Sequence, residues 1–109
     1  MGITLNKQKG QRIIEFGGGD NPNPDTDVRV DARKGKYTSF VHDLNNTPYP
    51  IRDMEFDGCY SHFLMEHISF RNTANFVAEC FRILKPGGKL MLAIPNTEKQ
   101  LQWIQDHPA

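Results

Sequence analysis

The feature that most constrains the fold is a short apolar run that ends in three consecutive glycines. Residues 12–16 are mostly apolar, and Gly17, Gly18 and Gly19 follow them directly. A run of this length before glycine is typical of a buried strand that ends in a flexible turn. Residues 20–25 then include two prolines, which disfavour helical backbone in the residues before them. We therefore expect a strand and a glycine turn with no helix directly behind it.

Four other segments have the composition of strands. They contain residues with high strand propensity and are flanked by turn-forming residues. These segments are residues 27–31, 39–43, 56–62 and 89–94. The last is almost entirely apolar, as expected for a strand that is covered on both faces of a sheet.

Two helices are expected. Apolar residues recur every three or four positions over residues 70–84, which predicts a helix with one apolar stripe. The stripe consists of Phe70, Ala74, Val77, Phe81 and Leu84. The Lys-Pro-Gly-Gly sequence of residues 85–88 would end this helix. A capping-box pattern at residues 97 and 100 predicts a last helix over residues 97–105.

The order of these elements predicts a largely parallel α/β sheet with right-handed crossovers. The 109 residues are enough for one domain, which we expect to span residues 1–109. No apolar stretch approaches the roughly 20 residues of a membrane span, and residues 1–7 lack the hydrophobic block of a signal peptide. We therefore expect a cytoplasmic protein with no membrane partner.

Charge and cysteine content exclude further classes. The 13 Lys and Arg residues balance 13 Asp and Glu residues, and a nucleic-acid-binding protein would need a clustered excess of positive charge. No nucleic-acid partner is therefore expected. Cys59 and Cys80 have neither metal-ligand spacing nor the density of a disulfide scaffold. We expect buried free thiols and no metal site.

Ligands of open parallel sheets bind beyond the carboxyl ends of the strands. The glycine turn follows the first expected strand, and Asp31 ends the second. Glycines allow the backbone to approach a ligand closely, and an acidic residue at this second position can accept hydrogen bonds from ribose hydroxyls. This pattern predicts a cofactor that contains adenosine.

The surrounding charge distinguishes between two such cofactors. A dinucleotide site needs a helix N-terminus behind the glycine turn to bind the pyrophosphate, and the prolines oppose such a helix. Five carboxylates lie within residues 15–31, with Arg29 as the nearby cation. This field favours a cationic ligand, such as a sulfonium with an α-ammonium group. S-adenosylmethionine therefore fits better than NAD, which disfavours a nicotinamide-dependent oxidoreductase.

Several motifs in order resemble class I S-adenosylmethionine-dependent methyltransferases. They are residues 14–22, 30–31, 42–44, 56–57, 60–68, 82–88 and 94–96. The resemblance is to the small-molecule and bacterial-surface type, methyltransferase type 11, whose glycine motif continues as Asn-Pro. It implies a Rossmann-like three-layer sandwich with a mainly parallel five-stranded sheet of order 3-2-1-4-5. It also implies that the two C-terminal antiparallel strands of longer members are lacking.

The resemblance implies S-adenosyl-L-methionine as cofactor and S-adenosyl-L-homocysteine as product. The glycine turn would contact methionine and ribose, with Glu15 near the α-ammonium group or acting through the loop backbone. Asp31 would bind the ribose hydroxyls, while Asp43 and the Leu44 backbone would meet the adenine edge. Ser61 and His62 would line the methyl end. The full implied set is Glu15, Gly17, Gly18, Gly19, Asn21, Asp31, Ala32, Asp43, Leu44, Ser61 and His62.

The sequence departs from the family pattern in the glycine loop. The third glycine of the usual pattern is replaced near Asp20, and Gly17 lies only 14 residues before Asp31. The helix that normally separates the first two strands must therefore be shortened or missing. Two of the assignments also have simpler structural explanations: the glycines could form merely a tight turn, and Asp43 could cap a turn through its side chain.

The catalytic residues are not identified by these motifs. Methyl transfer is an in-line displacement, so alignment of donor and acceptor is the main requirement, and a general base is needed only if the acceptor loses a proton. His62 is the first candidate for such a base and His67 the second.

We expect a methyltransferase that acts on a small-molecule or surface-polysaccharide-related acceptor. The alternative is a non-catalytic S-adenosylmethionine-binding module or fragment that acts through oligomerisation. An uncovered fifth strand would invite pairing with another chain. The sequence therefore predicts either a homodimer through the strand at residues 89–94 and the last helix, or a truncated part of a longer enzyme.

Overall fold

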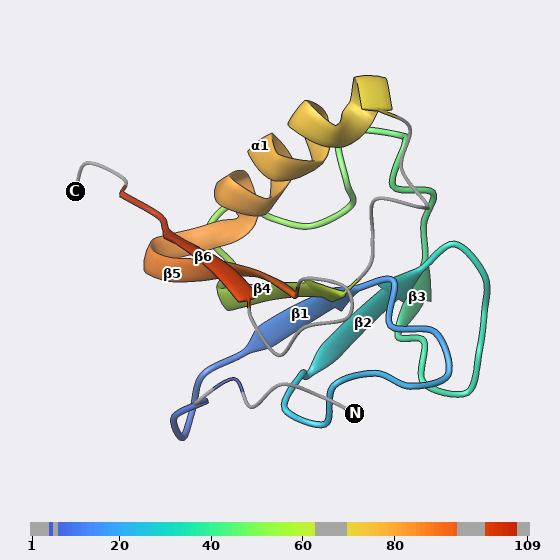
Figure 1. Cartoon of the computed structure of the whole chain (residues 1–109), viewed down its shortest axis with the longest axis horizontal. Coiled ribbons are helices and arrows are strands. Elements are labelled where there is room, and N and C mark those ends of the chain that lie inside the picture. Colours follow the sequence, from blue (N-terminus) through green and yellow to red (C-terminus); the bar gives the residue numbers. More distant parts are fainter. Residues whose placement is uncertain (1–4, 6, 63–69, 94–99, 107–109) are drawn as a thin grey trace.

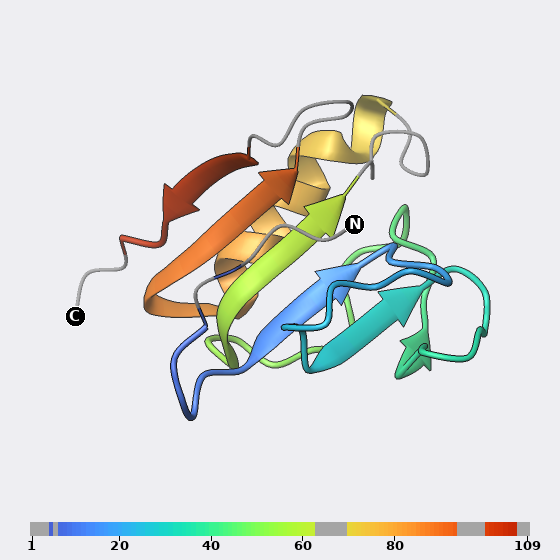
Figure 2. The same ribbon diagram turned by 60° about the horizontal axis from the view of Figure 1, so that its bottom comes forward.

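A computed structural model describes residues 5, 7–62, 70–93 and 100–106 of the chain. Six strands form one sheet in the order β3-β2-β1-β4-β5-β6, with a helix along one face (Figures 1 and 2). The strands are β1 (Ile13–Phe16), β2 (Val28–Asp31), β3 (Phe40–Val41), β4 (Phe56–His62), β5 (Leu84–Ala93) and β6 (Gln100–Ile104). A 3₁₀ turn, η2 (Phe70–Asn72), precedes the helix α1 (Thr73–Ile83).

The first five strands confirm the predicted sheet. β1 pairs in parallel with both β2 and β4, β2 pairs in parallel with β3, and β4 pairs in parallel with β5. The order 3-2-1-4-5 is therefore the one expected. As also expected, the segment between β1 and β2 contains turns and no helix. β5 begins at Leu84, earlier than predicted, because residues 85–88 bulge between the pairs Phe56–Leu84 and Gly58–Lys89.

The helix predicted over residues 97–105 is wrong for its described part. Residues Gln100–Ile104 form β6, which pairs antiparallel with β5. Leu101 and Trp103 alternate with glutamines, which is a strand pattern, and the open edge of β5 offers a full row of backbone hydrogen bonds. A capping box contributes only about 1 kcal/mol, so pairing along the strand outweighs it.

β6 also overturns the expectation that the edge of β5 is bare. Lys89, Leu90, Met91, Leu92 and Ala93 each have a partner residue in β6. β6 itself forms this edge of the sheet, and β3 lies at the opposite edge (Figure 2). The predicted homodimer loses its premise of an unpaired β5 and stays a prediction.

Alternate side chains along the strands pack in two apolar clusters, one on each face of the sheet. The cluster under α1 includes Ile14, Phe16 and Cys59, together with Phe76 of the helix. The cluster on the other face joins Leu5, Ile13, Tyr60, Met91 and Ala93. Leu5 is the member of this second cluster that lies outside the strands, and the α-helix of the described part of the chain packs against the first cluster.

The helix packs with a face displaced from the predicted stripe. The residues of α1 that are buried are Phe76, Glu79, Cys80 and Ile83, whereas Ala74 of the predicted stripe is exposed. Val77 and Phe81 are partly buried at the side of the core. The predicted stripe left out Phe76, Cys80 and Ile83, although Cys80 was expected to be buried, and it could not anticipate the buried carboxylate of Glu79.

Arg82, in the last turn of α1, compensates the buried negative charge of Glu79 on the packed face of the helix. Its Nε and Nη2 atoms donate to the two carboxylate oxygens of Glu79 at 2.7 and 2.9 Å. Nη1 donates to the Ile51 carbonyl oxygen and to Asp53 Oδ1, both at 2.8 Å. Glu79 Oε1 also accepts from the Tyr49 amide at 2.6 Å. This network fastens the helix to the segment that precedes β4.

Both cysteines are buried and free, as expected from their spacing. Within the described ranges, no group of three or more His, Cys, Asp or Glu side chains could hold a metal ion. The same residues include no helix with the length and hydropathy needed to cross a bilayer.

Candidate functional site

The glycine turn lies where the parallel strands β1, β2 and β4 end at one edge of the sheet. Gly17 and Gly19 have φ angles of 76° and 56°, in the left-handed region that glycine adopts without strain. Hollows lie on both sides of this turn. The β2-side cavity, of about 620 Å³, is lined by Gly19, Asp20, Asp31, Ala32, Arg33, Lys34, Gly35 and Thr38. The β4-side cavity, of about 390 Å³, is lined by Glu15, Gly17, Gly18, Asn21, Asn23, Tyr60 and His62.

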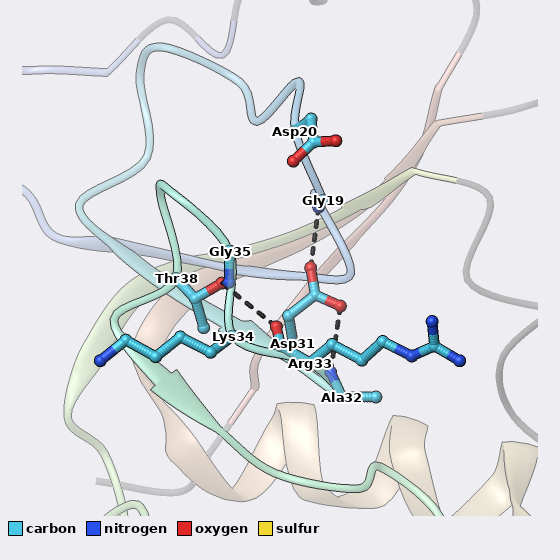
Figure 3. Close-up of a pocket in the computed structure, with 8 residues that line it drawn as sticks. All are labelled: Gly19, Asp20, Asp31, Ala32, Arg33, Lys34, Gly35 and Thr38. Atoms are coloured by element: carbon cyan, nitrogen blue, oxygen red, sulfur yellow. Dashed lines mark hydrogen bonds between the residues drawn. The ribbon is translucent and has the colours of Figure 1, made fainter.

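Asp31 joins the glycine turn to the end of β2 in the β2-side cavity (Figure 3). Its Oδ2 accepts from the Gly19 amide at 2.8 Å, and its Oδ1 accepts from the Ala32 amide at 3.0 Å. A carboxylate has about four acceptor positions, so these two bonds leave room for hydroxyl donors from a ligand. Asp31 can thus fix the turn and bind a diol at the same time.

Glu15 organises the loop that follows the glycine turn. Its side chain is 1% exposed, and its Oε1 accepts from the Asn23 amide and from Thr26 Oγ1, both at 2.8 Å. Burial raises the pKa of Glu15, and the bonds from Thr26 and Asn23 and the charge of Arg29 oppose that rise. This contact with the loop backbone is one of the two roles expected for Glu15.

The Glu15 carboxylate also explains why Gly18 is a glycine. A Cβ added to Gly18 would lie 2.7 Å from Glu15 Oε2 and 3.2 Å from the Pro22 Cα, whereas one added to Gly19 would meet nothing within 4 Å. Gly18→Ala should therefore cost about 2 kcal/mol of unfolding free energy. Gly19→Ala has only the left-handed backbone to oppose it and should cost about 1 kcal/mol. Urea denaturation of the two variants tests this, and a smaller loss for Gly18→Ala would contradict the packing argument.

The raised pKa of Glu15 gives a pH dependence with a definite sign. Between its ordinary pKa of 4.5 and the raised one, the folded state binds more protons than the unfolded state. Stability from this group is therefore present below pH 4.5 and is lost as the pH rises. Glu15→Gln removes the titration and keeps an acceptor for Asn23 and Thr26. Its unfolding free energy, relative to the wild type, should rise between pH 4 and pH 7 in urea titrations; a constant difference would refute the assignment.

The end of β4 places its side chains on alternate faces. Glu15 and Tyr60 are partners in the β1–β4 register, and Tyr60 and His62 line the β4-side cavity with Glu15. Burial raises the pKa of Tyr60, and a hydrogen bond from the Asn23 side chain opposes part of that rise. Burial lowers the pKa of His62, which favours a neutral imidazole. Ser61 faces the other way, is 1% exposed, and donates to the Phe16 carbonyl oxygen at 3.1 Å.

The structure separates Asp43 and Leu44 from these cavities. Asp43 Oδ1 accepts from the amide and the side-chain Nδ2 of Asn45 at 2.9 and 3.1 Å, which is the turn-capping role considered as the alternative. The Leu44 side chain is buried in the core, and its carbonyl oxygen accepts from the Tyr49 hydroxyl at 2.9 Å. Neither residue lines the β2-side or the β4-side cavity. Their contact with adenine stays a prediction.

Several residues of the site were not predicted from sequence. Tyr60 could have been found, because side chains two apart in a strand share a face and His62 was already a candidate. The remaining ones are Asn23, Lys34, Gly35 and Thr38, together with Asp20 and Arg33, which follow expected strands directly but were assigned no contact with the cofactor. Their positions depend on how two loops fold back on the strand ends, and no periodic pattern encodes that. His67 lies outside the described residues.

Comparison with known proteins identifies the family of the chain. A family model described as "Methyltransferase domain" matches residues 21–92 of the chain. The chain belongs to the methyltransferase domain family. Membership implies S-adenosylmethionine as the cofactor and S-adenosylhomocysteine as the product. A protein of Mycolicibacterium smegmatis, named "Probable S-adenosylmethionine-dependent methyltransferase", is 35% identical over 68 residues. That match covers 62% of this chain and 22% of the relative. The chain therefore spans only a small part of the relative's length.

Solved structures show the same fold. A methyltransferase from Thermotoga maritima is similar with a TM-score of 0.62 at 23% identity, over 77% of this chain and 44% of that chain. One from Methanosarcina mazei has a TM-score of 0.59 at 18% identity, over 79% of this chain and 53% of that chain. Both proteins are described as S-adenosylmethionine-dependent methyltransferases. At these identities the likeness supports the methyltransferase fold alone.

Proposed function

We propose that this chain binds S-adenosylmethionine across its glycine turn and serves as the catalytic core of a methyltransferase. The observation that carries the proposal is the Asp31 carboxylate, which bonds the Gly19 amide and has a cavity beside it. The adenosine half would occupy the β2-side cavity, with its ribose hydroxyls on Asp31. The methionine half would occupy the β4-side cavity, beside Glu15 and His62.

The distribution of charge supports this orientation. The β4-side cavity is lined by the acidic Glu15 and by uncharged Asn21 and Asn23, and no Lys or Arg is among the described residues that line it. The β2-side cavity is lined by Arg33 and Lys34 as well as by two aspartates. A sulfonium and an α-ammonium group, both positive, are therefore better placed on the β4 side.

The chemical step first requires that the methyl donor and the acceptor are aligned. A lone pair of the acceptor forms a bond to the methyl carbon while the carbon–sulfur bond breaks, and its electron pair goes to sulfur to give S-adenosylhomocysteine. Where the acceptor must lose a proton, we propose that His62 takes it. His62 lines the β4-side cavity, and its lowered pKa keeps the imidazole neutral and able to accept a proton near pH 7.

The proposed acceptor is a small molecule or is related to a surface polysaccharide. The protein is proposed to act in the cytoplasm and to have no nucleic-acid partner. Balanced charge over the whole chain is the support for that last point.

The test uses methyl-labelled S-adenosylmethionine with panels of oxygen, nitrogen and carbon acceptors. Label transfer to any acceptor, with loss on His62→Gln for those that must release a proton, is the expected result. Cofactor binding without transfer to any acceptor would favour the non-catalytic module instead. Binding of NAD in preference to S-adenosylhomocysteine in a competition titration would contradict the proposal.

A further inference from the structure

The two oxygens of the Glu15 carboxylate have different surroundings. Oε1 accepts the two loop bonds, from the Asn23 amide and from Thr26 Oγ1. Oε2 lies toward Gly18, because a Cβ on Gly18 would come within 2.7 Å of it. Gly18 and Glu15 both line the β4-side cavity. One oxygen therefore holds the loop, and the other lies against Gly18 of the glycine turn.

Thr26 and Arg29 support the oxygen that holds the loop. Thr26 Oγ1 lies 2.8 Å from both Glu15 Oε1 and the Asn23 carbonyl oxygen, but its single hydrogen can serve only one of them at full strength. Arg29 Nη2 already donates to the Asn23 carbonyl oxygen at 3.0 Å, and Arg29 Nε donates to Thr26 Oγ1 at 3.0 Å. The hydroxyl hydrogen is thus directed to the carboxylate. A chain runs from guanidinium through hydroxyl to Glu15, and each bond in such a chain polarises the next.

This chain opposes the effect of burial. A carboxylate that is 1% exposed would favour its neutral form without donors, because burial penalises charge. Among the residues that the structure describes, the titratable groups that face it are Arg29 and Asp31 from β2, and Tyr60 and His62 from β4. Arg29 is the one permanent cation in that set, and the packed loop contributes the neutral donors Asn23 and Thr26.

We propose that Thr26 and Arg29 are positioning residues that keep Glu15 ionised, so that its negative charge lies beside the β4-side cavity where the α-ammonium group of the cofactor would bind. The proposal rests on the proposed function, since it names which chain residues prepare that site. Thr26 carries no signal in the sequence and Arg29 is visible there only as a nearby cation, because their link to Glu15 exists only once the loop has folded without a helix.

The test is the pH dependence of S-adenosylhomocysteine binding between pH 5 and 7.5, where an α-ammonium group stays largely charged. Thr26→Val keeps the shape and removes the hydroxyl, and Thr26→Ser keeps the hydroxyl. Thr26→Val should bind about tenfold more weakly at the acid end and converge toward the wild type as the pH rises, since a hydrogen bond to a charged group is worth about a factor of ten. Thr26→Ser should follow the wild-type profile. A general loss of structure would weaken binding at every pH and show no such convergence.

A second measurement needs no ligand and does not depend on one variant. The ¹³C chemical shift of the Glu15 carboxyl, followed against pH in the free protein, should give a higher midpoint in Thr26→Val and in Arg29→Gln than in Thr26→Ser. Equal midpoints, with the wild type binding S-adenosylhomocysteine normally, would overturn this inference alone. Failure of the wild type to bind at any pH would instead overturn the proposed function, and this inference with it.

Discussion

Asp31→Ala should weaken S-adenosylhomocysteine binding about a hundredfold, because it removes charge-assisted bonds to two ribose hydroxyls. The structure adds a second cause. The Asp31 carboxylate holds the Gly19 and Ala32 amides at 2.8 and 3.0 Å, so its loss also releases the turn. Isothermal titration calorimetry measures the change directly.

Asp20→Ala is the matched control for this prediction. Asp20 is also an aspartate that lines the β2-side cavity. The Gly19 and Ala32 amides, however, donate to Asp31 and not to Asp20. Its replacement should change the dissociation constant by less than about threefold, the size of a screened charge effect. Equal losses in the two variants would mean that general negative charge, and not the Asp31 contacts, accounts for binding.

Arg82→Ala should lower the unfolding free energy by about 3 kcal/mol, the typical cost of removing one partner of a buried ion pair. Glu79, whose side chain is only 11% exposed, would lose its cation, and the Ile51 carbonyl oxygen would lose its Nη1 donor. Urea denaturation at pH 7 gives the loss. Lys85→Ala is the control, because Lys85 lies 3.6 Å from Asp57 in an exposed pair and should cost less than about 1 kcal/mol.

The same variant has a characteristic pH dependence. The hydrogen bonds from Arg82 lower the pKa of Glu79 below its ordinary value of 4.5. The pair therefore contributes its full stability above pH 4.5 and loses it as the pH falls through the lowered pKa. The difference between the wild type and Arg82→Ala should shrink in acid. A difference that is constant down to pH 3 would assign the loss to packing rather than to the ion pair.

The parallel sheet could be predicted because each strand carries its own local signal. Residues 13–16 and 89–93 are apolar runs, and Gly17–Gly19 and the prolines behind them fix where the first ends. β6 could not be predicted in the same way. Thr97 and Gln100 suggested a helix, while the hydrogen-bonding edge that makes Gln100–Ile104 a strand is supplied by β5.

The same distinction between local signals and tertiary contacts applies to the residues of the candidate site. Asp31 and His62 stand directly at strand ends, so topology alone placed them beside the cavities. Asp43 stands after a two-residue strand, where the local turn with Asn45 decides its side-chain bonds. Thr26 and Arg29 are linked to Glu15 by hydrogen bonds that form only within the folded loop. Such contacts are visible only in three dimensions.

One cofactor is proposed to span both sides of the glycine turn, and amide chemical-shift mapping by NMR tests this most directly. S-adenosylhomocysteine should shift the amides of Gly19 and Ala32 in the β2-side cavity, and those of Gly18 and His62 in the β4-side cavity. Methylthioadenosine, which lacks the α-ammonium group, should shift the first pair and leave the second nearly unchanged. Absence of shifts at both sites with a millimolar excess of S-adenosylhomocysteine would contradict the account.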